Sequence, residues 1–159
     1  ATLSGQFGVH ERLSLGLFFR SGKYIDEDPN DPNIEVQRNA ITTFGLNARG
    51  YLVNNDKFNL YGGFGWGASS LIHEKDQLIA GILAFDQDLD WKGNGWFGEF
   101  GFNAYFGETA GMFLNLRYEN QNLNLKEYTI NNNPQNLTNN RYDLQGIGFF
   151  FDIGLSLRF

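Results

Sequence analysis

Residues 147–159, the final stretch of the chain, read IGFFFDIGLSLRF, and every second residue is large and apolar. The positions between them hold mostly glycine or polar residues, such as Asp152 and Ser156. Side chains on a β-strand alternate between its two faces. The stretch therefore predicts a strand with one apolar and one mostly polar face. The apolar positions are Ile147, Phe149, Phe151, Ile153, Leu155, Leu157 and Phe159.

The same alternation recurs along the rest of the chain. The connections between these predicted strands are in turn a short polar turn and a long polar loop. This order is typical of an antiparallel up-and-down meander with all tight turns at one end. The second long connection contains an apolar piece at 78–85, which we interpret as a loop segment or short helix packed over a rim. The predicted strands cover residues 2–9, 13–24, 39–52, 58–72, 91–106, 112–127 and 142–159.

Length and composition exclude several classes of protein. The chain of 159 residues suits one domain covering 1–159. It contains no run of about 18 apolar residues, which excludes a helical membrane protein. Its net charge of −6 argues against binding nucleic acid through the phosphates. The absence of cysteine excludes disulfides and thiolate metal sites.

The apolar faces favour an all-β protein that spans a membrane. Within lipid, only a closed barrel satisfies every backbone group of a sheet. The predicted strands exceed the ~9–11 residues needed to cross the bilayer, so we expect them to project on the long-loop side. The alternative is a soluble β-sandwich with the aromatic residues in its core, and that arrangement would leave the glycine-rich faces exposed to solvent.

Over its whole length the chain resembles small bacterial outer-membrane β-barrels of the OmpX and OmpA-barrel type. The resemblance rests on the apolar faces, the alternation of short turns and long loops, and the terminal residues 155–159. It implies a Gram-negative outer membrane, with long loops outside and the short turns and C-terminus in the periplasm. It also implies that Leu155, Leu157 and Phe159 form the signal that the barrel-assembly machinery reads. The Asn-rich loops suggest a Bacteroidota source.

The count of seven strands departs from this family, because bacterial single-chain barrels have even strand numbers. With Phe159 at the periplasmic end, the first strand runs downward, and an upward strand should precede it. We therefore expect a closed transmembrane barrel of eight strands, the first of them upstream of Ala1. Two alternatives remain open: a partner supplies the strand, or residues 75–88 hide a further hairpin.

Charged residues recur on the predicted inward faces. Buried charges must be paired or solvated, so the structural interpretation is a salt-bridged barrel interior. The functional interpretation is a polar path or gate, although an eight-stranded barrel is only wide enough for its own side chains. The residues of this predicted interior network are Arg20, Arg49, Glu99, Arg117, Glu119, Asp152 and Arg158.

Aromatic residues fall at two levels on the predicted outward faces, as membrane-interface girdles require. One level lies beside the short turns and the other some seven to ten residues above them. The predicted girdle consists of Phe58, Trp66, Trp96, Phe106, Tyr118 and Phe159.

Catalytic and metal-binding interpretations are weak. His10 falls in a predicted periplasmic turn, away from the outer rim where outer-membrane acyl transferases and deacylases place their histidine. His73 lies beside Ser69, Ser70 and Glu74, but sequence neighbours on a strand point to different faces.

The acidic residues offer equally weak sites. Arg117 lies between Glu99 and Glu119 in the predicted interior, which disfavours an acid/base pair. The aspartates at 26–31 and 86–90 could hold calcium, but the cluster at 86–90 does not follow the EF-hand pattern, and we interpret both clusters as solvated loops that face outward. We predict no enzyme activity, no metal and no cofactor.

The sequence thus predicts a non-enzymatic integral outer-membrane barrel with a structural or surface-interaction role through its long loops. Its expected partners are outer-membrane lipid, the barrel-assembly machinery during insertion, and an outer-membrane protein. The alternatives are an accessory barrel subunit of a larger outer-membrane complex, or a narrow conduit for small or hydrophobic solutes.

Overall fold

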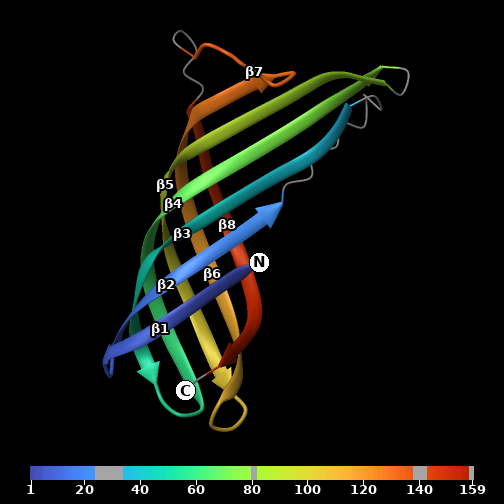
Figure 1. Cartoon of the computed structure of the whole chain (residues 1–159). Coiled ribbons are helices and arrows are strands. Elements are labelled where there is room, and N and C mark those ends of the chain that lie inside the picture. The colour runs from blue at the N-terminus through green and yellow to red at the C-terminus, as the bar shows by residue number, and fades with distance from the viewer. Residues whose placement is uncertain (24–33, 80–81, 138–142, 158–159) are drawn as a thin grey trace.

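The chain folds into one antiparallel sheet that curls around itself (Figure 1). The structure, a computed structural model, describes residues 1–23, 34–79, 82–137 and 143–157. Within these ranges, no helix is both long enough and apolar enough to cross a membrane. The strands are β1 (Thr2–His10), β2 (Leu13–Lys23), β3 (Ile34–Asn54), β4 (Phe58–Ile79), β5 (Ile82–Tyr105), β6 (Ala110–Ile130), β7 (Asn133–Pro134) and β8 (Asp143–Leu157).

Strand order follows the chain, so the predicted antiparallel meander is confirmed. Each strand from β1 to β6 pairs with its sequence neighbour, and β8 pairs with β6 along its whole length. The two-residue strand β7 pairs with the end of β6 and lies inside the third predicted loop. Short turns join β1 to β2, β3 to β4 and β5 to β6, all at one end of the sheet.

The predicted closure into a barrel is not confirmed, because the sheet is an open, curled half-barrel. Its edges are β1 and β8, which pair with β2 and β6 but not with each other. Both edge strands run toward the short-turn end, since β1 enters the first turn and β8 ends beside the start of β6. Two strands that run in the same direction cannot pair as antiparallel neighbours.

The central strands are longer than the sequence pattern predicts. The ladder between β4 and β5 continues to the pair Ile79 and Ile82, so the expectation of a loop segment or short helix at 78–85 is wrong. The described residues of the range 75–88 extend β4 and β5 and do not form the further hairpin that the sequence analysis left open. Backbone pairing with the neighbouring strand keeps this segment extended even where the alternation of side chains fades.

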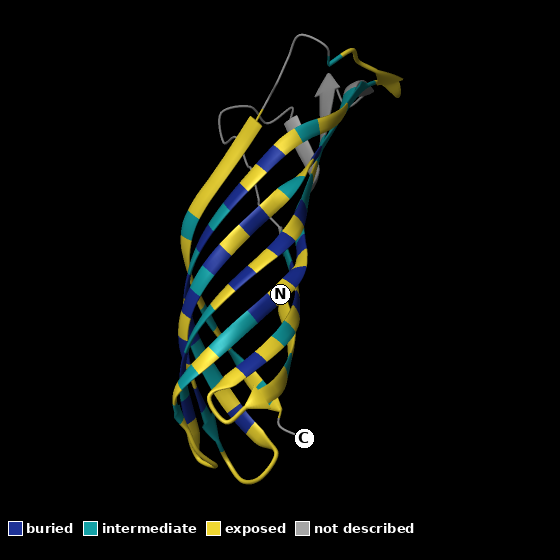
Figure 2. Ribbon diagram, turned by 90° about the vertical axis from the view of Figure 1, so that its left-hand side faces the viewer, coloured by how far each residue is buried: buried dark blue, intermediate teal, exposed yellow. Residues whose placement is uncertain are grey.

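Alternation along each strand separates an apolar outer face from a polar inner face. In β2, Leu15 and Leu17 are about half exposed, whereas Ser14 and Arg20 are buried. Bands of buried residues alternate in the same way with more exposed ones along β3, β4, β5 and β6 (Figure 2). Large apolar residues therefore lie on the convex surface, up to 80% exposed at Leu155. The sandwich architecture of the soluble alternative is not found, because the described strands form one sheet and no second sheet covers these faces.

Candidate functional site

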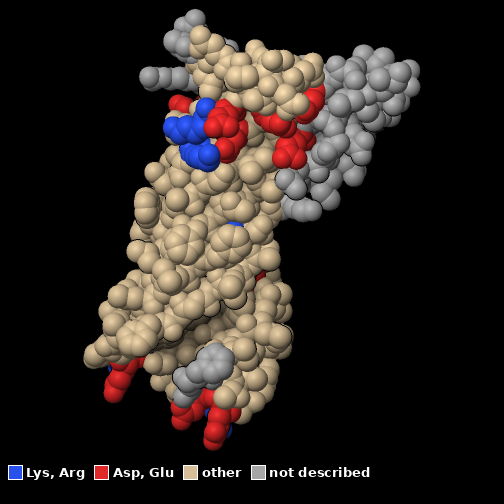
Figure 3. Space-filling model, viewed as in Figure 1, with Lys and Arg blue, Asp and Glu red and all other residues tan. Residues whose placement is uncertain are grey.

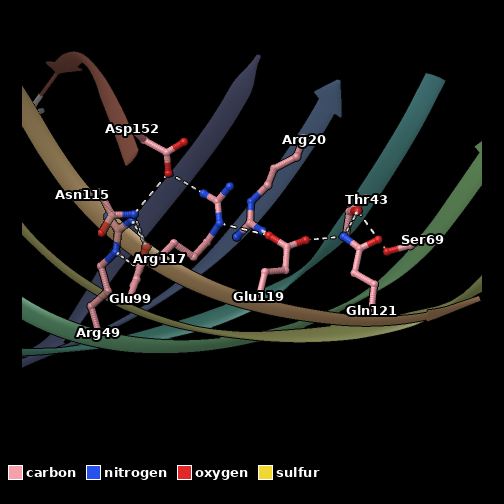
Figure 4. Close-up of polar contacts among 10 residues, drawn as sticks. All are labelled: Arg20, Thr43, Arg49, Ser69, Glu99, Asn115, Arg117, Glu119, Gln121 and Asp152. Carbon is pink, nitrogen blue, oxygen red and sulfur yellow. Dashed lines mark hydrogen bonds and ion pairs between the residues drawn. The ribbon is translucent and has the colours of Figure 1, made fainter. Parts of the chain in front are cut away.

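An ion-pair network lies on the concave face, with Arg117 of β6 at its centre (Figure 4). The Arg117 Nε donates to Glu119 Oε2 at 3.0 Å, and its Nη1 donates to Asp152 Oδ2 at 2.5 Å. From β2, Arg20 Nη1 reaches the same Glu119 oxygen at 2.7 Å. Side chains from β2, β6 and β8 thus meet across the interior of the curled sheet.

A second ion pair joins this network through an amide. Arg49 of β3 donates to both oxygens of Glu99 on β5, at 2.6 and 3.3 Å. The Asn115 Nδ2 lies 3.0 Å from Glu99 Oε2 and 3.5 Å from Asp152 Oδ2. Asn115 therefore links the Arg49 pair to the Arg117 cluster.

Neutral polar groups continue the network toward the long-loop end. Gln121 donates to Glu119, and its Nε2 lies 3.4 Å from the Thr43 hydroxyl. Thr43 Oγ1 in turn contacts Ser69 Oγ at 2.9 Å. Hydrogen bonds thus extend from Asp152 on β8 to Ser69 on β4.

Charge within this cluster is balanced, since three arginines face three carboxylates. All six side chains are at least three-quarters buried, and that of Asp152 is the most exposed at 22%. Burying a charge is costly unless a partner and hydrogen bonds compensate it. The pairing makes this part of the interior neutral overall. Of the predicted network, Arg158 lies outside the described residues.

Aromatic rings pack against the guanidinium groups of the arginines, a feature that the sequence analysis missed. The Arg20 guanidinium lies 4.4 Å from the Phe18 ring centroid and 4.0 Å from that of Phe97. The two rings pack edge to face, 5.1 Å apart. Arg49 lies over Tyr61 in the same way, at 4.4 Å. The available signal was the occurrence of a large aromatic residue on a face otherwise made of glycine and polar residues.

Glycines make room for these rings, which gives a test of the packing. A Cβ atom on inward-facing Gly65 would overlap the buried Phe97 ring, whereas one on outward-facing Gly98 would meet nothing within 4 Å. We expect Gly65→Ala to lower the free energy of unfolding by about 1–3 kcal/mol, the usual cost of overpacking. Urea titration of the purified, folded protein measures this change. Gly98→Ala is the matched control and should change little, and equal losses would contradict the packing.

A cavity of about 700 Å³ lies between the network and the short-turn end. Its lining is rich in amides and hydroxyls, and part of it is already hydrogen-bonded: Gln6 contacts both Asn47 and Ser14, at 2.9 and 3.0 Å. Residues of both edge strands contribute to its wall, so the cavity is continuous with the opening of the sheet.

The predicted aromatic girdle lies on the convex face. Trp66 and Phe106 are 54% and 68% exposed, and Phe58 and Trp96 are exposed to a lesser degree. Tyr118 is half-buried because its ring packs against neighbouring rings, including that of Trp96 at 5.6 Å. In the predicted assembly signal, Leu155 and Leu157 point outward, and Phe159 lies outside the described residues.

On the face that Figure 3 shows, charged side chains gather at the two ends, separated by a broad belt in which almost no charge reaches the surface. At the long-loop end, Lys92 Nζ lies 2.7 Å from Asp90 Oδ2. A hydrogen bond to the Asp90 carboxylate raises the pKa of Lys92, which keeps this ammonium charged. At the short-turn end, exposed charges occupy the turns at 11–12 and 56–57.

The weaker candidates for chemistry are not brought together. His10 and His73 lie at opposite ends of the sheet. Glu99 and Glu119 are each hydrogen-bonded to arginine, and the Ser69 hydroxyl contacts Thr43.

The acidic clusters form no metal site among the described residues. No group of three or more His, Asp or Glu side chains there is arranged to hold a metal ion. Asp88 and Asp90 instead contact the hydroxyls of Thr129 and Ser70, at 3.4 and 3.3 Å. The cluster at 26–31 lies outside the described residues.

Comparison of the chain with protein-family models, curated proteins and solved structures gives no match. The geometry of the sheet therefore carries the functional argument.

Proposed function

We propose that this chain is a non-enzymatic integral protein of the bacterial outer membrane, in which the curled sheet closes into a β-barrel. Its long loops and projecting strands give it a structural or surface-interaction role. Outer-membrane lipid surrounds it, and the barrel-assembly machinery inserts it.

The observation that carries this proposal is the apolar belt on the convex face. Exposed large apolar residues occur on every long strand, whereas charge lies either inside the sheet in ion pairs or at its two ends. A contiguous apolar surface of this size is rare on soluble monomers, and membranes are one environment that covers it. The backbone groups of the strands between the two edges already pair within the sheet, and closure into a barrel would pair those of the edges, as lipid requires.

Strand length supports a role outside the membrane. The 22 residues of β4 extend over about 70 Å, and at a tilt of ~40° they rise by about 55 Å. A barrel's apolar band is only ~25 Å tall. The short turns begin close to the belt. Most of the strand length beyond the apolar band therefore projects on the long-loop side. This projection also suits the alternative of an accessory subunit, which would contact a partner there.

The interior disfavours the alternative of a conduit. Ion pairs and hydrogen bonds connect side chains from β2 to β8 above the cavity. A solute would have to break several of these contacts to pass. The same network suits a rigid scaffold that presents loops.

Fractionation of cells that express the natural protein tests the proposal. We expect the protein to sediment with outer membranes, to resist extraction by alkaline carbonate and urea, and to migrate differently in electrophoresis before and after boiling. A peripheral membrane protein and an inner-membrane protein are the controls. Recovery in the wash or in the soluble fraction would contradict the proposal.

A further inference from the structure

A patch of exposed amide side chains lies on the convex face, at the long-loop side of the apolar belt. In β6, Asn122 follows Tyr118 by four residues and therefore shares its outward face. Asn122 pairs with Asn94 of β5 on one side and with Gln145 of β8 on the other. Directly paired residues have neighbouring side chains, so these amides form one surface. The amide patch consists of Asn94, Asn122, Asn124 and Gln145, all of them exposed.

Aromatic rings border the amide patch on the side of the belt. Trp96 of β5 is 38% exposed, and its ring lies 5.6 Å from that of Tyr118 on β6. The Tyr118 ring lies 5.1 Å from that of Phe149 on β8, which is 75% exposed. These three rings form a row across β5, β6 and β8, the same three strands that carry the amide patch.

The amide patch is uncharged, and the charges beyond it are of both signs. Lys92 pairs with Asn124 across the ladder and forms an ion pair with Asp90 at 2.7 Å. On its other side, Asn124 pairs with Asp143. Phosphate groups are bound most strongly by Arg and Lys, and Lys92 already has a carboxylate partner. The patch therefore suits an uncharged head group better than an anionic one. The charged residues beyond it are Lys92, Lys126, Asp90, Glu127 and Asp143.

The other boundary of the belt has a different chemistry. At the short-turn end, Phe58 directly follows the exposed Lys57, and Phe106 lies two residues before the exposed Glu108. The apolar face thus meets charged turns directly at this end. At the long-loop end, Asn94 lies between Trp96 and Lys92 on the outward face of β5. The two boundaries of the belt therefore match head groups of different kinds.

Exposed amides beside aromatic rings are suited to a sugar. An Asn or Gln side chain has both donors and acceptors, as the hydroxyl groups of a sugar do. The C–H face of a sugar ring is apolar and packs against the face of an aromatic ring. Tryptophan and tyrosine rings lie at the level of the head groups in a membrane, so the amide patch beyond them lies among the head groups.

We propose that the amide patch and the adjoining rings bind the uncharged sugar head group of a glycolipid, in the leaflet at the long-loop side. The inference rests on the proposed function, because it requires that the apolar belt lies in lipid. The amides bind the sugar hydroxyls, and Trp96 and Phe149 contact the face of the sugar ring. The acyl chains lie along the belt toward the short turns. This continuity of patch and belt favours a lipid over a free saccharide.

Nuclear Overhauser effects in lipid nanodiscs test this assignment. One sample contains phosphatidylcholine with digalactosyldiacylglycerol, and the other contains phosphatidylcholine with phosphatidylglycerol. We expect contacts between galactose ring protons and the side-chain amide protons of Asn122 and Asn124. The exposed amide of Asn55, in a short turn, is the matched control and should show no such contacts. Equal contacts at Asn55, or equally strong contacts from phosphatidylglycerol head groups at Asn122, would overturn the proposal.

The methyl groups of Leu116 separate this proposal from the membrane proposal. They should contact acyl-chain protons, because Leu116 lies in the apolar belt. Acyl contacts at Leu116 without galactose contacts at Asn122 would overturn the glycolipid site and leave the membrane proposal standing. Loss of both sets of contacts would overturn both proposals. Equally strong contacts from free galactose, added to nanodiscs of phosphatidylcholine alone, would overturn the assignment to a lipid.

A pair of variants gives a second readout. Asn122→Leu removes the amide at similar size, and Asn122→Gln retains it. The shift of the Asn124 side-chain amide is followed as the fraction of digalactosyldiacylglycerol rises. We expect the leucine variant to need roughly fivefold more glycolipid for half of the shift, as the loss of a hydrogen bond implies, and the glutamine variant to resemble the unaltered protein. The same titration curve for both variants would contradict a role for the amide.

Discussion

Replacing Arg117 with methionine is expected to lower the free energy of unfolding by about 3–5 kcal/mol. Arg117 contacts both Glu119 and Asp152, and its side chain is only 6% exposed. Glu119 keeps Arg20 as a partner after the change, whereas Asp152 retains only a weak contact with Asn115. The decrease in the free energy of unfolding therefore reports the cost of leaving the Asp152 carboxylate without a counter-charge inside the sheet.

Urea titration in lipid vesicles, followed by tryptophan fluorescence, measures this effect. Arg12→Met is the matched control, since Arg12 is exposed in the first short turn, and its effect should stay within about 0.5 kcal/mol. The double variant Arg117→Met with Asp152→Asn removes the uncompensated charge and should recover part of the loss. A double variant as unstable as the single variant contradicts this account.

Replacing Leu116 with arginine is expected to cost about 2–4 kcal/mol, although the next residue in the chain is already an arginine. Leu116 is 52% exposed on the convex face and pairs with the outward residues Phe100 and Phe151. It lies near the middle of the apolar belt, between Met112 and Tyr118. In the proposed membrane-spanning barrel, an arginine there would enter the hydrocarbon without a partner.

Leu116→Met keeps the side chain apolar and of similar size, so it should leave stability nearly unchanged. Unfolding in vesicles and in a short-chain detergent separates the lipid contribution from packing. The arginine variant should be destabilised most in vesicles. Equal stability of the arginine and methionine variants in vesicles would mean that lipid does not contact this face.

The faces of the strands could be predicted from the sequence because a period of two is fixed by the backbone. The residues Leu15 and Arg20 of one strand illustrate this, since one is exposed and the other buried as the alternation predicts. The extension of β4 to Ile79 could not be predicted in the same way. It depends on a neighbouring strand that offers backbone partners, and this is a property of the pair.

The interior shows a similar division. Alternation places charged residues inside, but the choice of Glu119 as the partner of Arg20 depends on two strands that are not adjacent in the sheet. Asn115 and Gln121 link the ion pairs, and as neutral residues they give no distinctive sequence signal. Phe97 is apolar on a polar face and escaped prediction because its role is to pack against Arg20.

The meander has a mechanical consequence. Backbone hydrogen bonds hold each long strand only to its neighbours in the sheet, and β8 is an edge strand with 15 paired positions against β6. A force that pulls the end of β8 sideways therefore loads one ladder at a time, since no strand crosses over another to share the tension. We expect the sheet to unfold in steps under such a force, with one strand or hairpin released per event while the rest of the sheet stays intact.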